Sequence, residues 1–430
     1  MKKSILEKAK KIHFIGIGGI GMSAIAKMFL LEGKSVSGSD TSDSEIISEL
    51  KKSGAEIFIG HDEKNISKDI DLVIYTIAIA GDNSEFVEAK KRKLNTITYP
   101  EALHEISKDK YTIAISGTHG KTTTTAMIAK ILMDAGLDPT VIVGSILKDA
   151  KSNFVAGKSK YLVVEACEYR KSFLNIEPNI AVVTNIDNDH LDFYKDLEDI
   201  QKAFGEFADK VPKNGYIVCD TKDKSVSYSI KDVVGKIVNN LEFKDKNLKL
   251  KIPGEHNKSN ASMALAVAHI LGISKKSAEK SLEDFSGTWR RFEYKGDTKK
   301  GVVVYDDYGH HPTEIKASIK CAREMFPNKK ITIVFQPHLY SRTKLLLNDF
   351  VEVLKKADSV VLAPIYAARE PHDITVSSEI LKEKIGKKAK SFPCFQDIEN
   401  HLIDSLSKDD ILITMGAGDI FKVGESILDL

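Results

Sequence analysis

The chain has 430 residues, too many for a single hydrophobic core, so we expect two or three domains of ordinary size. Apolar residues make up 42% of it and charged residues 29%, a balance that is typical of a globular protein and excludes a disordered or fibrous one. The 63 Lys and Arg residues nearly cancel the 61 Asp and Glu residues, so no overall basic charge favours binding to nucleic acid or to a membrane surface.

Cysteine usage and the first residues indicate the compartment. The four cysteines are far apart and form no CxxC pair, which argues against a disulfide framework and a structural zinc site. The charged start at residues 1–8 lacks the apolar stretch of a signal peptide, and no later run reaches the roughly 18 apolar residues of a membrane helix. We therefore expect a cytoplasmic protein without membrane insertion.

The first predicted α/β unit begins with a strand at residues 11–15, which leads through glycines into a helical pattern at residues 23–30. Further strands are expected at residues 35–38 and 72–76. The polar stretch 106–110 has the composition of a linker. This order of elements predicts a first domain with a parallel sheet.

The glycines after the first strand are candidates for binding a pyrophosphate. Gly16, Gly18, Gly19 and Gly21 contain the GxGxxG spacing, and Asp40 ends the next strand, near where a ribose partner would lie. NAD is the obvious ligand of such a loop. A UDP-sugar presents the same pyrophosphate to the same helix terminus, so it is an equal candidate at this point.

The second unit contains a phosphate loop, which follows the predicted strand 111–115 and precedes an apolar helix. The loop consists of Gly117, Thr118, His119, Gly120, Lys121, Thr122 and Thr123. Its backbone N–H groups can converge on phosphate oxygens, while Lys121 reaches the outer phosphates and Thr122 can bind Mg²⁺. Ile115 replaces the first glycine of the usual spacing, which argues against the common GTPase switches.

Two side chains after neighbouring strands complete the predicted metal and nucleotide site. Glu165 ends the strand 161–165, where its carboxylate can bind Mg²⁺ directly or through water. His190 follows the strand 180–184 and is a candidate metal or phosphate ligand. Ligands of open α/β sheets gather at the carboxyl ends of the strands, so we expect these residues to converge. The Lys-rich segment 220–251 is weakly periodic and predicts solvated surface.

A third unit follows residues 289–292. Its strands are expected at residues 302–305, 331–335, 359–363 and 410–414, and helical patterns separate them. Right-handed crossovers and a parallel sheet follow from that alternation. The whole chain is therefore predicted to be an α/β protein built from three such units.

Several motifs in order resemble the Mur ligases of peptidoglycan synthesis, and within that family the branch that adds L-alanine. They are residues 13–23, the phosphate loop, and residues 254–257, 291–293, 306–314, 335–338 and 415–419. The resemblance implies a Rossmann-like UDP-sugar domain at residues 1–108. It also implies a central, P-loop ATPase-like domain at residues 109–291 with a mainly parallel sheet, and a Rossmann-like amino-acid domain at residues 292–430.

The resemblance also implies a reaction and its residues. ATP, with Mg²⁺, would activate the lactyl carboxylate of UDP-N-acetylmuramate as an acyl phosphate, which L-alanine then attacks. Lys121, Glu165, His190, Arg291 and His310 would carry the chemistry. The ATP site would include the phosphate loop, His256, Asn257, Asn260 and Asp307; the amino-acid site would include His310 and Arg342; and the metal ligands would be Thr122, Glu165 and His190.

Alternatives remain at this stage. Leu339 stands where the alanine-adding branch often has Arg, so glycine or L-serine are alternative amino acids. An NAD-dependent oxidoreductase would leave the phosphate loop unused, and a nucleotide-dependent switch or scaffold would use it without forming a bond. Arg290 and Arg291 could be a solvated hinge pair. The resemblance is compatible with a monomer or a homodimer in the bacterial cytoplasm.

Overall fold

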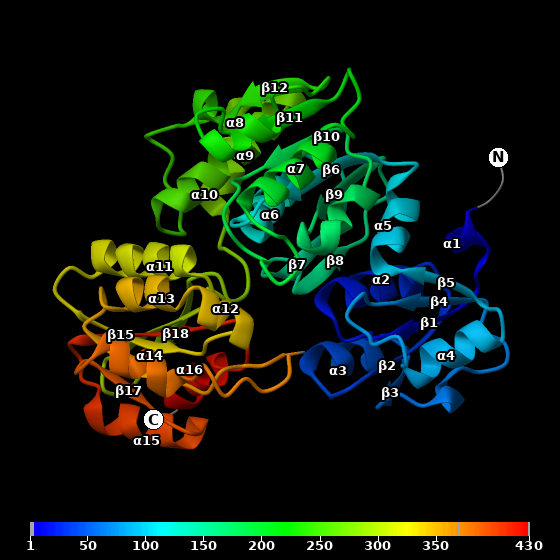
Figure 1. Cartoon of the computed structure of the whole chain (residues 1–430). Helices are drawn as coiled ribbons and strands as arrows, with labels where there is room; N and C mark the ends of the chain where they lie inside the picture. Colours follow the sequence, from blue (N-terminus) through cyan, green and yellow to red (C-terminus); the bar gives the residue numbers. More distant parts are fainter. Residues whose placement is uncertain (1–3, 369, 429–430) are drawn as a thin grey trace. The chain divides into compact units, whose positions relative to one another are not determined.

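The computed structural model describes residues 4–368 and 370–428, which form three β-sheets with helices on their faces (Figure 1). By their contacts these residues divide into two compact units. The first unit contains most residues up to 285 and includes two sheets, and the second contains residues 188–196, 250–258 and 286 onward. Among the described residues, no helix combines the length and the apolar character that a membrane span requires.

The first sheet has five parallel strands in the order β3-β2-β1-β4-β5. Its strands are β1 (Lys11–Ile15), β2 (Ser35–Asp40), β3 (Glu56–Ile59), β4 (Leu72–Tyr75) and β5 (Asn95–Thr98). The helical segments of this region are α1 (Ile5–Lys8), α2 (Ile20–Leu31), α3 (Glu45–Lys52), η1 (Glu63–Asn65), α4 (Ser84–Lys91) and α5 (Tyr99–Ser107). Strands β2 and β3 are added on one side of β1, and β4 and β5 are added on its other side. The order of strands therefore changes direction at β1, and the glycine cluster follows β1 at this switch point.

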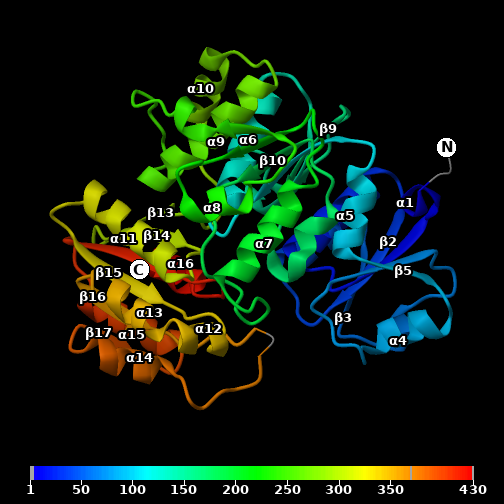
Figure 2. The same ribbon diagram turned by 45° about the horizontal axis from the view of Figure 1, so that its top comes forward.

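The second sheet has seven strands in the order β12-β11-β10-β6-β9-β7-β8, and only its β7–β8 pair is antiparallel among the described residues. The strands are β6 (Tyr111–Ser116), β7 (Thr140–Leu147), β8 (Ser152–Val155), β9 (Tyr161–Glu165), β10 (Ile180–Val183), β11 (Tyr216–Cys219) and β12 (Lys236–Asn239). The helices are α6 (Lys121–Asp134), η2 (Tyr169–Asn175), α7 (Leu197–Ala208), α8 (Lys224–Ser229), η3 (Asn240–Phe243), α9 (Glu255–Ile270) and α10 (Lys275–Asp284). Figures 1 and 2 both show α6, α9 and α10 close together beside this sheet.

The third sheet has six strands in the order β13-β14-β18-β15-β16-β17, with an antiparallel β13 at its edge. The strands are β13 (Glu293–Asp297), β14 (Val303–Asp307), β15 (Lys330–Phe335), β16 (Ser359–Leu362), β17 (Ala389–Ser391) and β18 (Asp410–Met415). The helices are α11 (Pro312–Met325), α12 (Tyr340–Leu345), α13 (Leu347–Leu354), α14 (Ser378–Ile385), α15 (Phe395–Ser405) and α16 (Phe421–Leu428).

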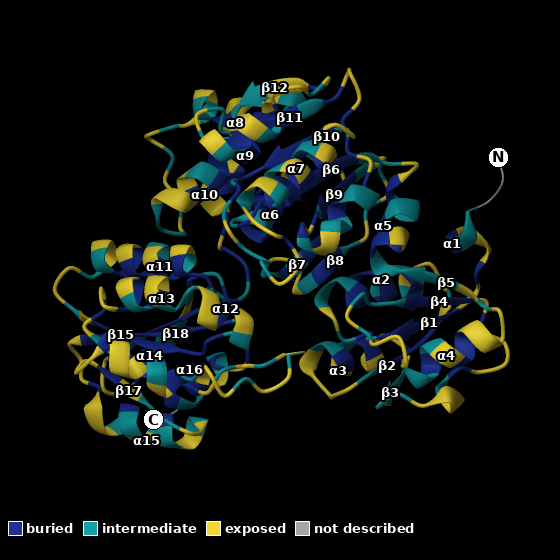
Figure 3. Ribbon diagram, viewed as in Figure 1, coloured by how far each residue is buried: buried dark blue, intermediate teal, exposed yellow. Residues whose placement is uncertain are grey.

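Side chains that alternate between the two faces of the central strands explain why the third sheet is covered on both faces. Ile331, Ile333 and Phe335 belong to one buried cluster, whereas Val334 belongs to another. Successive side chains of a strand point to opposite faces, so each face has its own core. The cluster with Ile333 includes residues of α11, α13 and α14, and the other includes residues of α15 and α16. Figure 3 shows the resulting buried strands and exposed outer helix surfaces.

The strands predicted from sequence are present, most within one or two residues of the expected bounds, and the α/β class with mainly parallel sheets is confirmed. The prediction of plain solvated surface for residues 220–251 was wrong in part. β12 pairs with β11 as the edge strand of the central sheet, and Val226 and Ile230 are buried. An edge strand is half exposed, so its sequence lacks the apolar run of the inner strands. The predicted linker at residues 106–110 is also partly helical, because α5 extends to Ser107.

Candidate active site

The phosphate loop connects the buried strand β6 to α6, which begins at Lys121. Gly117 and Gly120 have φ values of 135° and 84°, which other residues rarely adopt. A Cβ atom at Gly117 would lie 1.9 Å from Thr184 Oγ1, and one at Gly120 would lie 2.6 Å from Asn260 Oδ1. Backbone conformation and space therefore both require glycine at these two positions. The contact also places the predicted adenine-site residue Asn260 against the loop.

The loop is held in shape by the segment that follows β10. Asn185 O accepts a hydrogen bond from Thr118 N at 3.0 Å, and Asn185 Oδ1 accepts one from His119 N at 2.9 Å. Thr184 Oγ1 and Asn185 Nδ2 both donate to His119 O, at 2.6 and 2.9 Å. Thr184 and Asn185 thus fix the loop before any phosphate binds, which lowers the reorganisation needed for binding. Sequence reasoning did not single out Asn185, although it lies in the polar run that includes His190.

Lys121 is charged and points back over the loop. Its Nζ donates to Gly117 O at 2.5 Å, to Thr118 O at 3.1 Å and to Glu168 Oε1 at 2.9 Å. Burial by itself lowers the pKa of Lys121, but the nearby carboxylates of Glu168 and Glu165 outweigh it and raise the pKa above its ordinary value. The ammonium group therefore keeps its positive charge at every physiological pH.

Glu165 and Thr122, two of the predicted Mg²⁺ ligands, lie together beside the phosphate loop. Thr122 Oγ1 donates to Glu165 Oε1 at 3.2 Å, and Gly144 N donates to Glu165 Oε2 at 2.8 Å. A hydroxyl and a carboxylate at this distance offer the oxygen ligands that Mg²⁺ prefers. A Cβ atom at Gly144 would lie 2.7 Å from Glu165 Oε1, so this glycine makes room for the carboxylate. The two predicted ligands in this unit are therefore brought together.

In the first sheet, the glycine cluster forms a tight turn between β1 and α2. Gly16 has a φ of 82°, and Gly18 N donates to Asp40 Oδ2 at 2.8 Å. Gly19 is the residue that precedes α2 and provides no side-chain cap, which leaves the helix N-terminus open to an anion. A Cβ atom at Gly21 would lie 2.5 Å from the Tyr99 ring. Asp40 ties the loop to the end of β2, and its contact with a ribose stays a prediction.

His190 belongs by its contacts to the second unit, where it lies beside a buried ion pair. Asp189 Oδ1 accepts hydrogen bonds from Arg342 Nη2 at 2.8 Å and from Arg342 Nε at 3.2 Å. Burial raises the pKa of Asp189, but the charges of His190, Arg342 and His310 outweigh it and lower the pKa below its usual range. Arg342 also donates to His338 Nδ1 at 2.8 Å. Arg342 therefore has a structural role, and its contact with an amino acid stays a prediction.

His310 is an imidazole of this unit with a lowered pKa. Burial lowers its pKa from 6.5 to about 4, an effect that the nearby Glu314 carboxylate only partly opposes. The neighbouring His311 caps a helix. It precedes α11, where its ring accepts from Thr313 N and Glu314 bonds back to its backbone, and Pro312 starts the helix.

The two adjacent arginines have different environments. Arg290 is only 3% exposed, and its guanidinium donates to Asp306 Oδ2 at 2.7 Å, to Gly418 O at 2.8 Å and to Gly416 O at 2.6 Å. The solvated-hinge alternative is therefore wrong for Arg290, because the C-terminal sheet buries it with three acceptors. Arg291 is half-buried, with its guanidinium 5.1 Å from the centre of the Tyr308 ring.

The second unit contains three residues of the predicted nucleotide site, namely His256, Asn257 and Asp307. Gly254 has a φ of 100°, and a Cβ atom there would lie 2.6 Å from the His256 ring. Asn257 Nδ2 donates to Pro253 O at 2.6 Å. Asp307 ends β14 and accepts hydrogen bonds from Ser318 Oγ at 2.6 Å and from Gly309 N at 2.7 Å. The contacts of these residues with a nucleotide stay a prediction.

We expect Asp307→Asn to stabilise the protein at neutral pH. Burial raises the pKa of Asp307 from 3.8 to about 6, so the folded state binds this proton more tightly than the unfolded chain does. The folded protein therefore loses stability as the pH rises from the unfolded-state pKa of 3.8 to the folded-state pKa of about 6, and asparagine avoids that loss. The free energy of unfolding should increase by roughly 1–3 kcal/mol at pH 7.5.

Urea unfolding at pH 7.5 and at pH 4.5, followed by the fluorescence of Trp289, measures this effect. The gain should shrink at the lower pH, where the wild-type carboxyl is already protonated. Asp306→Asn is the matched control, because Asp306 pairs with Arg290 and its replacement should destabilise the protein. A gain from Asp307→Asn that is equal at both pH values would contradict the assignment of the cost to ionisation.

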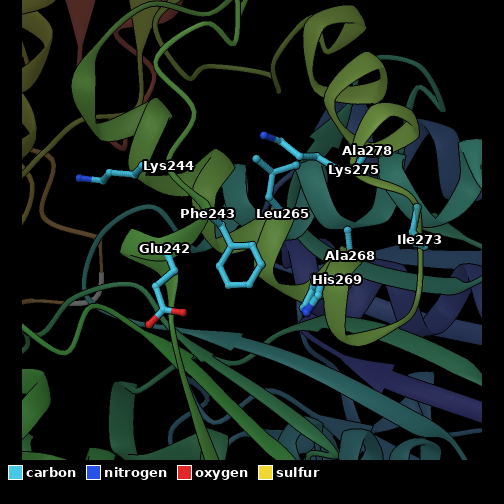
Figure 4. Close-up of a pocket in the computed structure, with 9 residues that line it drawn as sticks. All are labelled: Glu242, Phe243, Lys244, Leu265, Ala268, His269, Ile273, Lys275 and Ala278. Carbon is cyan, nitrogen blue, oxygen red and sulfur yellow. The ribbon is translucent and has the colours of Figure 1, made fainter.

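A separate pocket of about 260 Å³ lies at the C-terminal end of α9 (Figure 4). The Phe243 and His269 rings line it, with their centroids 5.3 Å apart. Along the helix, His269 lies roughly 13 Å from Asn260, which contacts the phosphate loop. No residue of the predicted site lines this pocket, so the nucleotide site is a different one.

Comparison with known proteins decides the family. Three family models match in order: "Mur ligase family, catalytic domain" at residues 11–111, "Mur ligase middle domain" at residues 115–247, and "Mur ligase, glutamate ligase domain" at residues 290–418. The chain belongs to the Mur ligase family. It is thus an ATP-dependent ligase that forms carbon–nitrogen bonds, and the oxidoreductase and switch alternatives for its two loops are excluded.

Individual relatives cover nearly the full length of this Mur ligase. The UDP-N-acetylmuramate--L-alanine ligase of Clostridium acetobutylicum is 45% identical, over 98% of each chain. That of a Clostridium botulinum strain is 43% identical, over 99% of each chain. The crystal structure of the UDP-N-acetylmuramate-alanine ligase of Thermotoga maritima is similar with a TM-score of 0.82 and 30% identity, over 97% of this chain and 98% of that one. The three-domain α/β fold is confirmed.

Proposed function

We propose that the protein joins L-alanine to the lactyl carboxylate of UDP-N-acetylmuramate and converts ATP to ADP and phosphate. The full-length similarity to ligases with that name supports the substrates. The observation that carries the chemistry is the charged Lys121 on a preformed phosphate loop, next to the Thr122–Glu165 pair. The product would be UDP-N-acetylmuramoyl-L-alanine, a precursor of peptidoglycan. We further propose a bacterial cytoplasmic enzyme that acts as a monomer or a homodimer.

The first step transfers the γ-phosphoryl group of ATP to the lactyl carboxylate. An oxygen of the carboxylate attacks phosphorus, the bond to the β-phosphate oxygen breaks, and ADP leaves. Negative charge spreads over the transferred group, so catalysis depends mostly on position and on nearby positive charge. Lys121 and Arg291 are proposed to supply that charge. Thr122, Glu165 and His190 would hold Mg²⁺, which neutralises phosphate charge when it is bound.

The second step forms the amide bond. The neutral amine of L-alanine attacks the acyl phosphate carbon, and the tetrahedral adduct then expels inorganic phosphate. An amine that attacks must lose a proton, and the imidazole of His310 is proposed to accept it because its lowered pKa keeps it neutral at the working pH. Arg342 and His310 would line the amino-acid site.

The proposed binding sites for the two nucleotides are centred on the glycine cluster and on the phosphate loop. Gly16, Gly18, Gly19, Gly21 and Asp40 would hold the UDP-sugar. The ATP site would comprise Gly117, Thr118, His119, Gly120, Lys121, Thr122, Thr123, His256, Asn257, Asn260 and Asp307. The proposed domains are residues 1–108 for the UDP-sugar, residues 109–291 for ATP and residues 292–430 for the amino acid.

The test is a phosphate-release assay on the purified chain. We expect release only when UDP-N-acetylmuramate, Mg-ATP and an amino acid are all present, with L-alanine giving a higher kcat/KM than glycine or L-serine. In the same assay His310→Ala should lower kcat by roughly 10²-fold, the ordinary contribution of a general base. Release that does not depend on UDP-N-acetylmuramate would exclude the proposed reaction, and a preference for glycine or L-serine would change the amino acid. Normal turnover by His310→Ala would exclude its role as base.

A further inference from the structure

Glu85 is a buried carboxylate that the proposed reaction does not use. It lies in the first turn of α4, and its side chain is fully buried. Its Oε1 accepts a hydrogen bond from Asn65 Nδ2 at 2.6 Å, and its Oε2 accepts one from Ser39 Oγ at 2.5 Å. Burial raises the pKa of Glu85, but its polar neighbours, first among them His13, outweigh burial and lower the pKa below its ordinary value. Glu85 is therefore ionised at neutral pH although water does not reach it.

This carboxylate lies directly behind the glycine cluster of the first sheet. Ser39 connects the two, because its side chain donates to Glu85 while its backbone O accepts a hydrogen bond from Gly16 N at 2.9 Å. The next residue, Asp40, accepts a hydrogen bond from Gly60 N at 2.8 Å through its backbone O. The polar side chains around Glu85 thus belong to the carboxyl edge of β2, which is where sheets of this kind bind their ligands.

His61 joins this cluster through one edge of its ring. Its Nδ1 lies 2.9 Å from Ser39 Oγ and 3.4 Å from Glu85 Oε2. The Ser39 hydroxyl has a single hydrogen, which it donates to Glu85, so towards His61 it can only accept. The hydrogen of the neutral ring is therefore on Nδ1, and the lone pair of an acceptor is on Nε2. Glu85 thus determines which nitrogen of His61 accepts a hydrogen bond.

The His61 ring also reaches the surface near the glycine cluster. Its side chain is 21% exposed, whereas that of Glu85 is fully buried. Asp40 pairs with Ile59 where β2 and β3 end, so His61, two residues later, follows the same edge of the sheet. A uridine bound at this edge has hydrogen donors in the N–H group of its uracil and the hydroxyls of its ribose. A ring nitrogen with a lone pair is the acceptor that such a donor requires.

We propose that Glu85 is a positioning residue for the UDP-sugar, because it fixes the tautomer of His61 in which Nε2 accepts a hydrogen bond from the uridine. This inference rests on the proposed function. Ser39 transmits the effect, since it donates to the carboxylate and accepts from the ring. When the carboxylate is absent, the Ser39 hydroxyl turns its hydrogen to Nδ1 and Nε2 becomes a donor. Two donors then face each other, and binding loses a hydrogen bond.

Glu85→Gln is the variant that reverses the tautomer without a change of size. Asn65 Nδ2 also donates to Gly60 O at 3.3 Å, so the orientation of Asn65 is fixed and the glutamine oxygen must face it. The amide nitrogen of the glutamine then faces Ser39 and donates to its hydroxyl. The hydroxyl in turn donates to His61 Nδ1, which leaves the ring hydrogen on Nε2.

Calorimetry on the purified full chain, with UDP-N-acetylmuramate and separately with UDP, measures the consequence. We expect Glu85→Gln to bind both ligands roughly 10–100-fold more weakly, the usual cost of a donor left unpaired in a binding site. His61→Phe should weaken binding by a similar factor. In the His61→Phe background, Glu85→Gln should add less than about a further twofold, because the two residues act through one hydrogen bond.

Matched variants separate the tautomer from a general loss of structure. Glu88→Gln changes a carboxylate one turn further along α4 that pairs with Arg92, and it should bind both ligands like wild type. Ser39→Ala leaves His61 Nδ1 3.4 Å from the Glu85 carboxylate, so the ring keeps its tautomer. Its binding should therefore stay within about threefold of wild type, although the altered side chain is equally buried.

The nitrogen-15 chemical shifts of the His61 ring, recorded at alkaline pH and assigned with His61→Phe, report the tautomer directly. Nε2 should be unprotonated in wild type and in Ser39→Ala, and protonated in Glu85→Gln. A wild-type ring with its hydrogen on Nε2 would overturn the proposal. So would wild-type affinity of Glu85→Gln or of His61→Phe, or equal losses in Glu85→Gln and Ser39→Ala.

His61 is partly exposed, so the wild-type spectrum and the affinity of His61→Phe test the proposal even if Glu85→Gln does not fold. None of these measurements needs ATP, an amino acid or turnover. Any of the contrary results in an enzyme that performs the ligation rejects this inference alone, whereas absence of ligation by the wild type rejects the proposed function.

Discussion

Arg290→Ala should lower the free energy of unfolding of the C-terminal sheet and its helices by roughly 3–5 kcal/mol, the usual cost of breaking a buried ion pair. The Arg290 and Asp306 side chains are 3% and 2% exposed and lie 2.7 Å apart. Burial raises the pKa of Asp306, and the Arg290 charge opposes that rise. Alanine would leave Asp306 with Thr414, which donates to it at 2.7 Å, but without a counter-ion. The carbonyls of Gly416 and Gly418 would lose their donors as well.

The adjacent arginine offers a matched control. Arg291 is half-buried over Tyr308, so Arg291→Ala should change stability by less than about 1 kcal/mol while it lowers turnover. Trp289 is the only tryptophan of the chain and lies next to both residues, so its fluorescence during urea unfolding reports on this region. Arg290→Lys should recover little, because one ammonium group cannot reproduce the fork of donors to three acceptors. An unfolding midpoint of Arg290→Ala equal to that of wild type would contradict the structural role.

Sequence reasoning located some strands of each sheet, most of them short apolar runs bounded by glycine and polar turns. These are β1, β2, β4, β6, β9, β10, β14, β15, β16 and β18, and the other strands were not predicted. It also located the phosphate loop, because the chemistry of a phosphate cradle fixes the order and spacing of Gly117, Gly120, Lys121 and Thr122. The edge strand β12 was not predicted, since half of it faces water and its pattern resembles a loop. Burial alone does not make a strand recognisable, because β7 was also not predicted although most of its residues are buried.

Partners that are distant in sequence were also beyond sequence reasoning. Arg290 and its acceptors at Gly416 and Gly418 are more than a hundred residues apart. Nothing in the local sequence indicates that Arg290 is the buried member of the Arg290–Arg291 pair. Asp189 and Arg342 are likewise 153 positions apart. Glu168 lies shortly after Glu165 in the chain, but its contact with Lys121 depends on how β9 and β6 pair in the sheet. Pairing of this kind is a property of the fold.

Lys121→Met should reduce kcat for phosphate release by roughly 10²–10³-fold, the cost of removing one preorganised charged donor from a developing anion. Methionine keeps the length and apolar stem of lysine, so the loop should retain its shape. Thr184, Asn185 and the two glycines would still hold the loop, although Gly117 O and Thr118 O lose the hydrogen bonds from the lysine side chain. The midpoint of thermal unfolding should fall as well, because the buried Glu168 carboxylate loses its counter-ion, so kcat is compared at a temperature where both proteins are folded.

Lys121→Arg is the control that separates charge from geometry. Arginine preserves the positive charge, but its planar group is larger than the ammonium group that fits between Gly117 O and Thr118 O. If charge alone mattered, the arginine variant would approach wild-type turnover. We instead expect it to recover part of the nucleotide affinity and little of kcat, because transition-state stabilisation requires the donor at a fixed distance. A Lys121→Met enzyme that kept more than a tenth of the wild-type kcat would remove Lys121 from the phosphoryl-transfer step and leave it a binding role only.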